Sequence, residues 1–308
     1  MSLTRRRLLH SSVLLAPLVA RAASTKMKIN LSPGAIGLKA DQRQAIEYAA
    51  KYGFQAVEPQ PAYLATLSNG EIDDIAGLVK QKNLVWGCAN MSVDFRKDGA
   101  TFRKDFNDLP KQAAVMQRAG VTRVGTYIAP GSDSLTFLEN LRQHTERLSE
   151  CALALGDQNL RLGLEYVAPK TLWSSRKYPF VHTMAEMKEL VAAIHKTNVG
   201  IVLDSWHWYT AGETTADLKT LRNKDIVSVD LNDAPVNVPV DQQVDSRREL
   251  PCATGVIDLA GFLNALQELN YDGPVRCEPF NSTIRAMAPE HALPVVISAM
   301  NKAFGLIH

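Results

Sequence analysis

Four acidic residues each end a short apolar run in the second half of the chain. Short runs rich in leucine and β-branched side chains are typical of buried parallel strands. In barrel enzymes, catalytic groups lie at the carboxyl ends of successive strands. Carboxylates that gather in one place repel one another and need a cation or a proton, so the pattern predicts a site for a hard divalent metal ion. The four residues are Glu165, Asp204, Asp230 and Glu278.

Strand-like and helix-like segments alternate along the chain without a linker or a low-complexity tract. This alternation predicts parallel strands joined by right-handed crossovers. Eight strand-like runs favour an α/β fold with a single (β/α)₈ TIM barrel, and an open doubly wound sheet is the alternative. The expected strands are 28–31, 56–58, 84–89, 123–127, 161–166, 199–204, 226–231 and 275–278. The expected helices are 41–52, 71–82, 105–119, 134–155, 183–197, 216–223 and 258–270.

The first 22 residues resemble a bacterial twin-arginine export signal. Arg5-Arg6-Arg7 precedes an apolar stretch and then Ala20-Arg21-Ala22, a small-x-small cleavage pattern. The apolar stretch is shorter than the ~20 residues that a membrane span needs, so we expect no span after cleavage. We therefore expect residues 23–308 to form one barrel domain in the periplasm.

Removal of the signal changes the charge of the chain. The whole sequence carries 34 basic and 32 acidic residues, a net charge of +2, and residues 1–22 contain four arginines and no acid. The mature chain is therefore expected to carry about −2. Without a basic stripe or patch, we expect neither nucleic acid nor an anionic membrane as a partner.

The two-residue period of a strand predicts where each acid points. Asp230 shares a strand face with Ser228, whereas Val227 and Val229 alternate with them, so the acid is expected to point into the barrel and the valines toward the helices. By the same parity Glu278 shares its face with Arg276 two residues earlier. A charged arginine inside a barrel needs a partner, so we expect an Arg276 ion pair below the site.

Residues ~28–280 resemble the xylose isomerase-like barrel superfamily, the sugar phosphate isomerase/epimerase and inosose dehydratase group. The order and spacing of several short motifs carry the resemblance. It implies metal ligation by Glu165, Asp204, position 230 and Glu278. The motifs are Gly53-Phe-Gln-Ala-Val-Glu58, Gly163-Leu-Glu165, Leu203-Asp-Ser-Trp-His207, Asp230-Leu-Asn-Asp233, Gly255-Val-Ile-Asp258 and Tyr271-Asp-Gly-Pro-Val275 leading to Glu278-Pro279.

Position 230 departs from the family pattern, which usually has histidine there. With Asp230, four carboxylates around a divalent ion leave a charge of −2, and an all-oxygen set disfavours zinc and favours Mn²⁺, Mg²⁺ or Ca²⁺. Alternatively, Asp230 lies outside the coordination sphere and Asn232 turns inward. A third alternative is that the metal is lost.

Several further polar residues are candidates for contact with a substrate. The resemblance implies that His207 contacts the substrate or the metal, and a histidine near its unperturbed pKa would transfer a proton at working pH. Trp206 beside it offers a flat apolar surface to the C–H face of a sugar ring. Arg247 and Arg248 lie where an arginine of relatives holds a substrate oxygen or phosphate. Glu58 ends the second strand, where relatives line the pocket or cap a helix.

The chemistry that fits is proton transfer next to a carbonyl. Glu165 and Glu278, on opposite faces of a keto-sugar, would remove and return the proton, with Mn²⁺ or Mg²⁺ as the expected cofactor. The predicted function is a metal-dependent sugar isomerase or epimerase that acts as a monomer or homo-oligomer on a small carbohydrate. One alternative is a lyase or dehydratase that eliminates from a keto-inositol or 3-keto-glycoside. Another is a periplasmic sugar-binding module with an eroded metal site.

Overall fold

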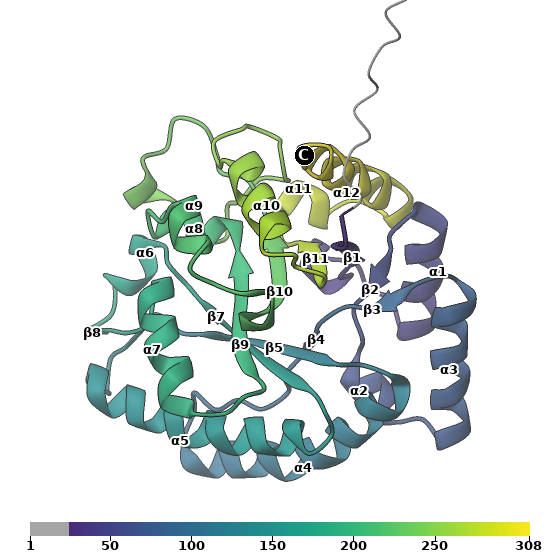
Figure 1. The fold of residues 1–308 in the computed structure, drawn as a ribbon, viewed down its shortest axis with the longest axis horizontal. Coiled ribbons are helices and arrows are strands. Elements are labelled where there is room, and N and C mark those ends of the chain that lie inside the picture. Colours follow the sequence, from purple (N-terminus) through teal and green to yellow (C-terminus); the bar gives the residue numbers. More distant parts are fainter. Residues whose placement is uncertain (1–24) are drawn as a thin grey trace, which may run out of the picture.

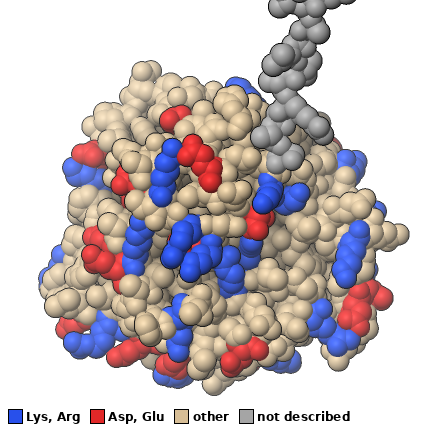
Figure 2. All heavy atoms as spheres, in the orientation of Figure 1, with Lys and Arg blue, Asp and Glu red and all other residues tan. Residues whose placement is uncertain are grey.

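The computed structural model describes residues 25–308. The expected export signal, residues 1–22, lies outside this range and stays a prediction. Within residues 25–308 no helix is both long enough and apolar enough to cross a membrane. On the face shown in Figure 2, acidic and basic side chains are interspersed, with several basic ones near its centre.

Nine parallel strands form one curled sheet, and the helices surround it (Figure 1). The strands neighbour one another in the order β3-β2-β1-β11-β10-β9-β7-β5-β4. The two end strands, β3 and β4, are separated along the chain only by Gly87 and Cys88, so the sheet closes on itself. This confirms the predicted single TIM barrel. The strands are β1 (Lys28–Leu31), β2 (Ala56–Val57), β3 (Val85–Trp86), β4 (Ala89–Asn90), β5 (Arg123–Ile128), β7 (Arg161–Tyr166), β9 (Val199–Asp204), β10 (Ile226–Leu231) and β11 (Pro274–Cys277).

The run 84–89 was predicted as one strand, but the structure divides it at Gly87. β3 pairs with β2, whereas β4 pairs with β5. A Cβ atom at Gly87 would collide with the side-chain amide of Asn30, which is buried inside the barrel. The absence of a side chain lets the chain pass close to Asn30 where the barrel closes.

The long helices pack outside the sheet at most of the predicted positions. Two differences stand out: α4 begins at Gly99 instead of 105, and α12 closes the barrel beside α1 although no helix was predicted there. The helices are α1 (Gln42–Tyr52), α3 (Asn69–Gln81), α4 (Gly99–Ala119), α5 (Phe137–Gly156), α7 (Met184–Ile194), α10 (Leu259–Glu268) and α12 (Pro289–Phe304), with the short α2 (Pro61–Leu64), α6 (Lys170–Trp173), α8 (Ser205–Thr210), α9 (Thr215–Leu218) and α11 (Ser282–Arg285).

The strand register brings the acids to one end of the barrel. Asp230 on β10 pairs with Asp204 on β9 and with Arg276 on β11. A β-bulge between Ile226 and Ser228 shifts the register of β10. The prediction that Val227 faces the helices is wrong, because the bulge turns its side chain toward Gly163 inside the barrel.

Asp233 fixes the long segment that leaves β10 and returns before α10. Its side chain is fully buried, and its two oxygens accept four backbone N–H groups. Oδ1 accepts from Ala234 at 2.8 Å and Ile257 at 3.0 Å, and Oδ2 accepts from Thr254 at 2.9 Å and Gly255 at 2.7 Å. One carboxylate therefore ties the start of this segment to its end.

His144 on α5 is a buried histidine between two phenylalanine rings. Its ring packs edge-on against Phe95 at 5.3 Å and lies 4.9 Å from Phe180. Nδ1 lies 2.9 Å from the Asn140 carbonyl and donates to it, while Nε2 has no partner among residues 25–308. Burial, with a smaller effect of the positive charge of Arg96, lowers the pKa of His144 to about 4.

Replacement of Asp233 by alanine should destabilise the protein by about 3 kcal/mol, because it leaves four N–H groups without acceptors, of which those of Ala234 and Ile257 are buried. Urea unfolding followed by circular dichroism measures this. Asp241→Ala, an exposed acid of the same segment paired with Lys170, is the control and should lie within about 1 kcal/mol of wild type. If the two variants unfold at the same urea concentration, Asp233 does not stabilise the protein by joining the two ends of this segment.

His144 should make stability fall in mild acid. Because its folded-state pKa lies below the unfolded value of about 6.5, its contribution is complete above that pH and is lost as the pH falls toward 4. The loss at pH 5 is on the order of 2 kcal/mol. In His144→Phe the unfolding midpoint should fall less between pH 7 and pH 5 than in wild type. His291→Gln, a change at an exposed histidine, is the control and should show the same pH dependence of the unfolding midpoint as wild type. If His144→Phe also shows the wild-type pH dependence, groups other than His144 cause the loss of stability in acid.

Candidate functional site

Four carboxylates meet at the carboxyl ends of neighbouring strands. One oxygen each of Glu165, Asp204, Asp230 and Glu278 lies within 4.8 Å of the others, and all four side chains are deeply enclosed. The first three stand on β7, β9 and β10, and Glu278 directly follows β11. The structure thus brings together the four strand-end acids, as a group that could hold a metal ion. We call them the four-carboxylate cluster.

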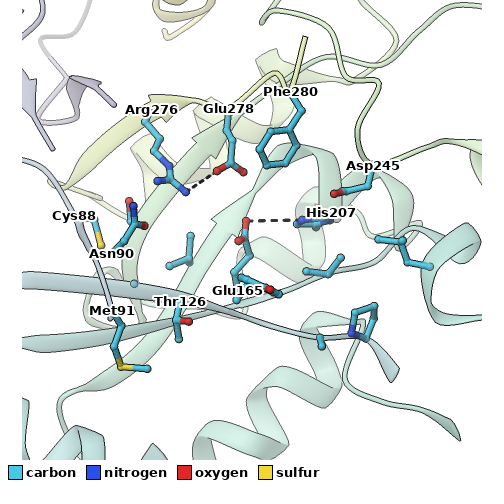
Figure 3. Close-up of a pocket in the computed structure, with 18 of the residues that line it drawn as sticks. Cys88, Asn90, Met91, Thr126, Glu165, His207, Asp245, Arg276, Glu278 and Phe280 are labelled. Atoms are coloured by element: carbon cyan, nitrogen blue, oxygen red, sulfur yellow. Dashed lines mark hydrogen bonds and ion pairs between the residues drawn. The ribbon is translucent and has the colours of Figure 1, made fainter. Parts of the chain in front are cut away.

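Arg276 enters this cluster from inside the barrel. Its Nε and Nη2 donate to the two oxygens of Asp230 at 2.7 and 2.9 Å, and Nη2 also donates to Oε1 of Glu278 at 2.9 Å (Figure 3). Its Nη1 lies 3.5 Å from Glu58. The expected ion pair of Arg276 is confirmed. The bidentate contact holds Asp230 in the cluster, and Asn232 lies beside it, because its Nδ2 donates to Oδ1 of Asp204 at 2.9 Å.

Arg248 enters the cluster from the opposite side, on the segment that Asp233 ties down. Its Nη1 donates to Asp204 at 2.7 Å and to Glu278 at 3.3 Å, and its Nη2 donates to Asp245 at 2.8 Å. The guanidinium is fully buried and its carbon lies 4.5 Å from the ring centre of Phe280. Arg248 is therefore a fixed internal cation.

The two arginines change the charge balance expected from the sequence. Four ionised carboxylates alone carry −4, but Arg248 and Arg276 reduce the charge at the cluster to −2. Asp245 and Glu58 also pair with these arginines, so the six acids and two arginines together carry −4. A divalent ion would leave this larger group at −2.

Glu165 is the member of the cluster that is least compensated. Its Oε1 is buried without a hydrogen-bond partner among the described residues. Burial raises the pKa of Glu165 well above its usual range, and the negative charge of Glu278 adds to this. Burial also raises the pKa of Glu278, although Arg276 opposes the shift. Both groups are thus poised to hold a proton more readily than exposed carboxylates.

His207 on α8 faces Glu165 across the cavity. Its Nε2 lies 3.8 Å from Oε1 of Glu165 and 3.8 Å from Oδ2 of Asp204 (Figure 3). The backbone N–H of Ala168 lies 3.2 Å from Nδ1, and Nη2 of Arg248, also a donor, lies 3.4 Å from Nε2. A neutral ring accepts at one nitrogen only, and the shorter contact, from Ala168, places the ring proton on Nε2. Burial and the charge of Arg248 lower the pKa of His207 to about 3. The expectation of an ordinary pKa is wrong: this ring is a neutral donor at working pH.

A cavity of about 570 Å³ opens in front of the cluster. It is lined by four of the predicted residues, Glu165, His207, Arg248 and Glu278. Further lining residues that the sequence argument did not single out as site residues are Arg96, Thr126, Tyr127, Leu172, Asp245 and Phe280. Three of these, Arg96, Asp245 and Phe280, come from loops, which lack the two-residue period that made the strand acids recognisable.

Three residues predicted to bind substrate lie elsewhere. Trp206 is fully buried, 5.5 Å from the carbon of the Arg248 guanidinium, so its ring is not available to a sugar. Arg247 is exposed and does not line the cavity, unlike its neighbour Arg248. The expectations for Trp206 and Arg247 are therefore wrong, and Phe280 offers the aromatic surface instead.

Glu58 is held by polar neighbours behind Arg276. It accepts from the Ser32 hydroxyl and, at 2.9 Å, from the Asn90 amide. Among the cavities it lines a separate open cleft and not the one in front of the cluster. Its place in the structure is that of a support for Arg276, so the expectation of direct substrate contact is not met.

The chain matches known proteins over most of its length. The profile of the xylose isomerase-like TIM barrel family matches residues 46–302. An inosose isomerase from Bacillus velezensis is 23% identical over 257 residues, which are 82% of this chain and 88% of that protein. The curated relatives found are enzymes.

Solved structures show the same fold. A xylose isomerase domain protein from Alicyclobacillus acidocaldarius is 28% identical, with a TM-score of 0.80 over 91% of this chain and 99% of that one. The IOLI protein, solved with a zinc atom, is 21% identical, with a TM-score of 0.76 over 92% of this chain and 99% of that one. Matching architecture and a family profile over residues 46–302 lead to one conclusion: this chain belongs to the xylose isomerase-like TIM barrel family.

Proposed function

We propose that the protein is a divalent-metal-dependent isomerase or epimerase that moves a proton next to the carbonyl of a keto-sugar. The observation that carries the proposal is the four-carboxylate cluster, whose least compensated member, Glu165, faces a cavity of small-molecule size. The inosose isomerase among its relatives supports the same reaction class.

The residues present fit a divalent cation. The four carboxylates with their two arginines carry −2, Asp245 and Glu58 add further negative charge, and Oε1 of Glu165 is a buried acceptor without a donor in the described part of the chain. Glu165, Asp204, Asp230 and Glu278 would hold the ion. When bound, it would polarise the carbonyl and a neighbouring hydroxyl of the sugar and so acidify the C–H bond between them.

The donor set favours Mn²⁺ or Mg²⁺ over zinc. The ligands of the four-carboxylate cluster are oxygens, which suit hard cations. Glu165, Asp204 and His207 form a second group that could hold a metal ion, and a ring nitrogen there would suit zinc. His207 is the nearby nitrogen, but its Nδ1 accepts from Ala168 and its Nε2 therefore carries the proton. A ring in that tautomer has no lone pair to give to a metal ion.

Glu165 and Glu278 are the proposed proton-transfer pair. Both line the cavity, and a carboxylate beside a C–H bond acidified in this way can act as a general base. Glu165 would remove the proton from the carbon next to the carbonyl. Glu278, oriented by Arg276 and Arg248, would return a proton from the other face.

His207 and Arg248 would orient the substrate and the acids. The Nε2–H of His207 would donate to a sugar oxygen in front of Glu165 and stabilise negative charge that develops there. Arg248 would keep Asp204 and Glu278 in place. If the signal directs export, free sugars or keto-sugars are more accessible to the enzyme than phosphorylated metabolites.

Glu165→Gln should abolish exchange of the substrate C–H with deuterated water, by a factor of about 10³ or more. NMR of keto-sugars and inososes incubated with enzyme, Mn²⁺ and deuterated water measures this. Without metal, the variant should unfold at the same or a higher temperature than wild type, because it removes a buried charge repelled by Glu278.

Glu189→Gln, an exposed change on α7, is the matched control and should exchange at the wild-type rate. If Glu165→Gln still catalyses the exchange, Glu165 is not the base that removes the proton. Release of water or of an aglycone in place of simple exchange would identify the lyase alternative. Sugar binding insensitive to a chelator, without exchange, would identify the binding-module alternative.

His207→Gln should leave Mn²⁺ affinity within about threefold of wild type and lower turnover about 100-fold, because the ring is a donor to substrate and not a ligand. Isothermal titration of metal-free protein separates the two quantities. Asp204→Asn is the comparison and should weaken Mn²⁺ binding at least about tenfold. A zinc preference that disappears in His207→Gln would show that the imidazole coordinates the ion.

A further inference from the structure

Arg96 lines the same cavity as the cluster but comes from other elements. The four acids come from β7, β9, β10 and the end of β11, which are neighbours in the sheet. Arg96 follows β4 and donates to the carbonyl of Tyr127 near the end of β5, the strand that pairs with β7. A ligand that fills the cavity would therefore meet both the cluster and Arg96.

The guanidinium of Arg96 is fixed before any ligand arrives. Its Nη1 donates to the Tyr127 carbonyl at 2.7 Å and to the Thr126 hydroxyl at 3.3 Å. Its Nε lies 3.3 Å from Asp94, and its carbon lies 4.2 Å from the ring centre of Tyr127 and 4.6 Å from that of Phe95. A cation held this way loses little conformational entropy on binding.

Arg96 keeps donors to spare. Among residues 25–308, its Nη2 has no hydrogen-bond or ion-pair partner, although its side chain is only 21% exposed. The other enclosed arginines of the cavity, Arg248 and Arg276, are engaged by carboxylates. Arg176 pairs with Asp133 and is more than half exposed. Arg96 therefore combines fixed position with free donors.

The charge around Arg96 is positive. Asp94 lies between two cations, 3.3 Å from Arg96 and 3.6 Å from Lys97. Asp105 accepts from the backbone of Asp94, and Arg147 donates to the carbonyls of residues 95 and 97. Asp94 and Asp105 together with Arg96, Lys97 and Arg147 carry a net charge of +1. The four carboxylates of the cluster with Arg248 and Arg276 carry −2.

We propose that Arg96 binds an oxyanion of the substrate, a carboxylate or a phosphate, while the reacting carbonyl lies at the cluster. The identity of the reacting end rests on the proposed function; the oxyanion subsite rests on Arg96 itself. Nη2 of Arg96 supplies charge-assisted hydrogen bonds to the anion. The substrate is then an acidic sugar derivative, with its neutral polyol end at the cluster.

Calorimetric titration of the purified Mn²⁺-loaded protein tests this with three probes that share one ring: D-glucose, D-glucuronate and D-glucose 6-phosphate. Wild type should bind at least one of the two anions about tenfold more tightly than glucose, as expected for a new charge-assisted contact. Whichever anion is preferred distinguishes carboxylate from phosphate. In Arg96→Gln the preference should fall to about twofold, with the affinity for glucose unchanged.

Arg103→Gln is the matched control. Arg103 also lies over aromatic rings, Phe102 and Phe106, and also pairs with an acid, Glu150, but it does not line the cavity. This variant should keep the wild-type preference. Because substitution of Arg96 also removes the ties to β5, its unfolding midpoint is measured in parallel and should lie near that of Arg103→Gln.

Three outcomes would overturn the proposal: equal affinity of wild type for glucose and both anions, no saturable binding of either anion, or an anion preference that survives in Arg96→Gln. Hydrogen exchange on neutral keto-sugars is followed with the same protein. If the protein catalyses hydrogen exchange but shows no preference for an anion that depends on Arg96, only the proposed oxyanion subsite is contradicted. If it prefers an anion through Arg96 but catalyses no exchange, only the proposed isomerase activity is contradicted.

Discussion

Electrostatic repulsion among four enclosed carboxylates is the constraint on which the rest of the site depends. Moving charges of one sign out of water and next to one another is unfavourable unless opposite charge accompanies them. The barrel supplies part of that charge through Arg276, on the strand that leads to Glu278, and part through Arg248, on a loop. What remains uncompensated is concentrated on Glu165, which faces the cavity. The negative charge that the arginines do not compensate is therefore accessible to a ligand or an ion in the cavity.

The parts of this arrangement that follow local periodicity could be predicted from the sequence. Strand parity gave the inward direction of Glu165 and Asp230 and the pairing of Arg276, because parallel strands that end at one edge bring their last residues together. The same parity failed at Val227, where a bulge adds a residue to β10. It also missed the break at Gly87, which depends on Asn30, a residue distant in sequence.

The remaining errors concern residues outside regular strands. Arg247 and Arg248 are adjacent in sequence, and nothing local distinguishes them, yet one is exposed and the other is buried against Asp204. The state of His207 likewise depends on burial and on a backbone donor contributed by Ala168. Loop conformation and burial arise from tertiary packing, so a pattern read along the chain does not contain them.

The tie formed by Asp233 has a thermodynamic consequence for the cluster. Arg276 is fixed on a strand, but Arg248 is carried by the segment whose two ends Asp233 joins. Asp245 lies on the same segment and pairs with Arg248, so any opening withdraws both charges together and leaves Asp204 and Glu278 without the hydrogen bonds that Arg248 donates. Opening and the uptake of a cation by these two carboxylates are therefore linked, and by reciprocity each favours the other. The order of this segment and the cation affinity of the site are therefore coupled. Asp233 influences that affinity through the order of the segment, although it does not contact the cation.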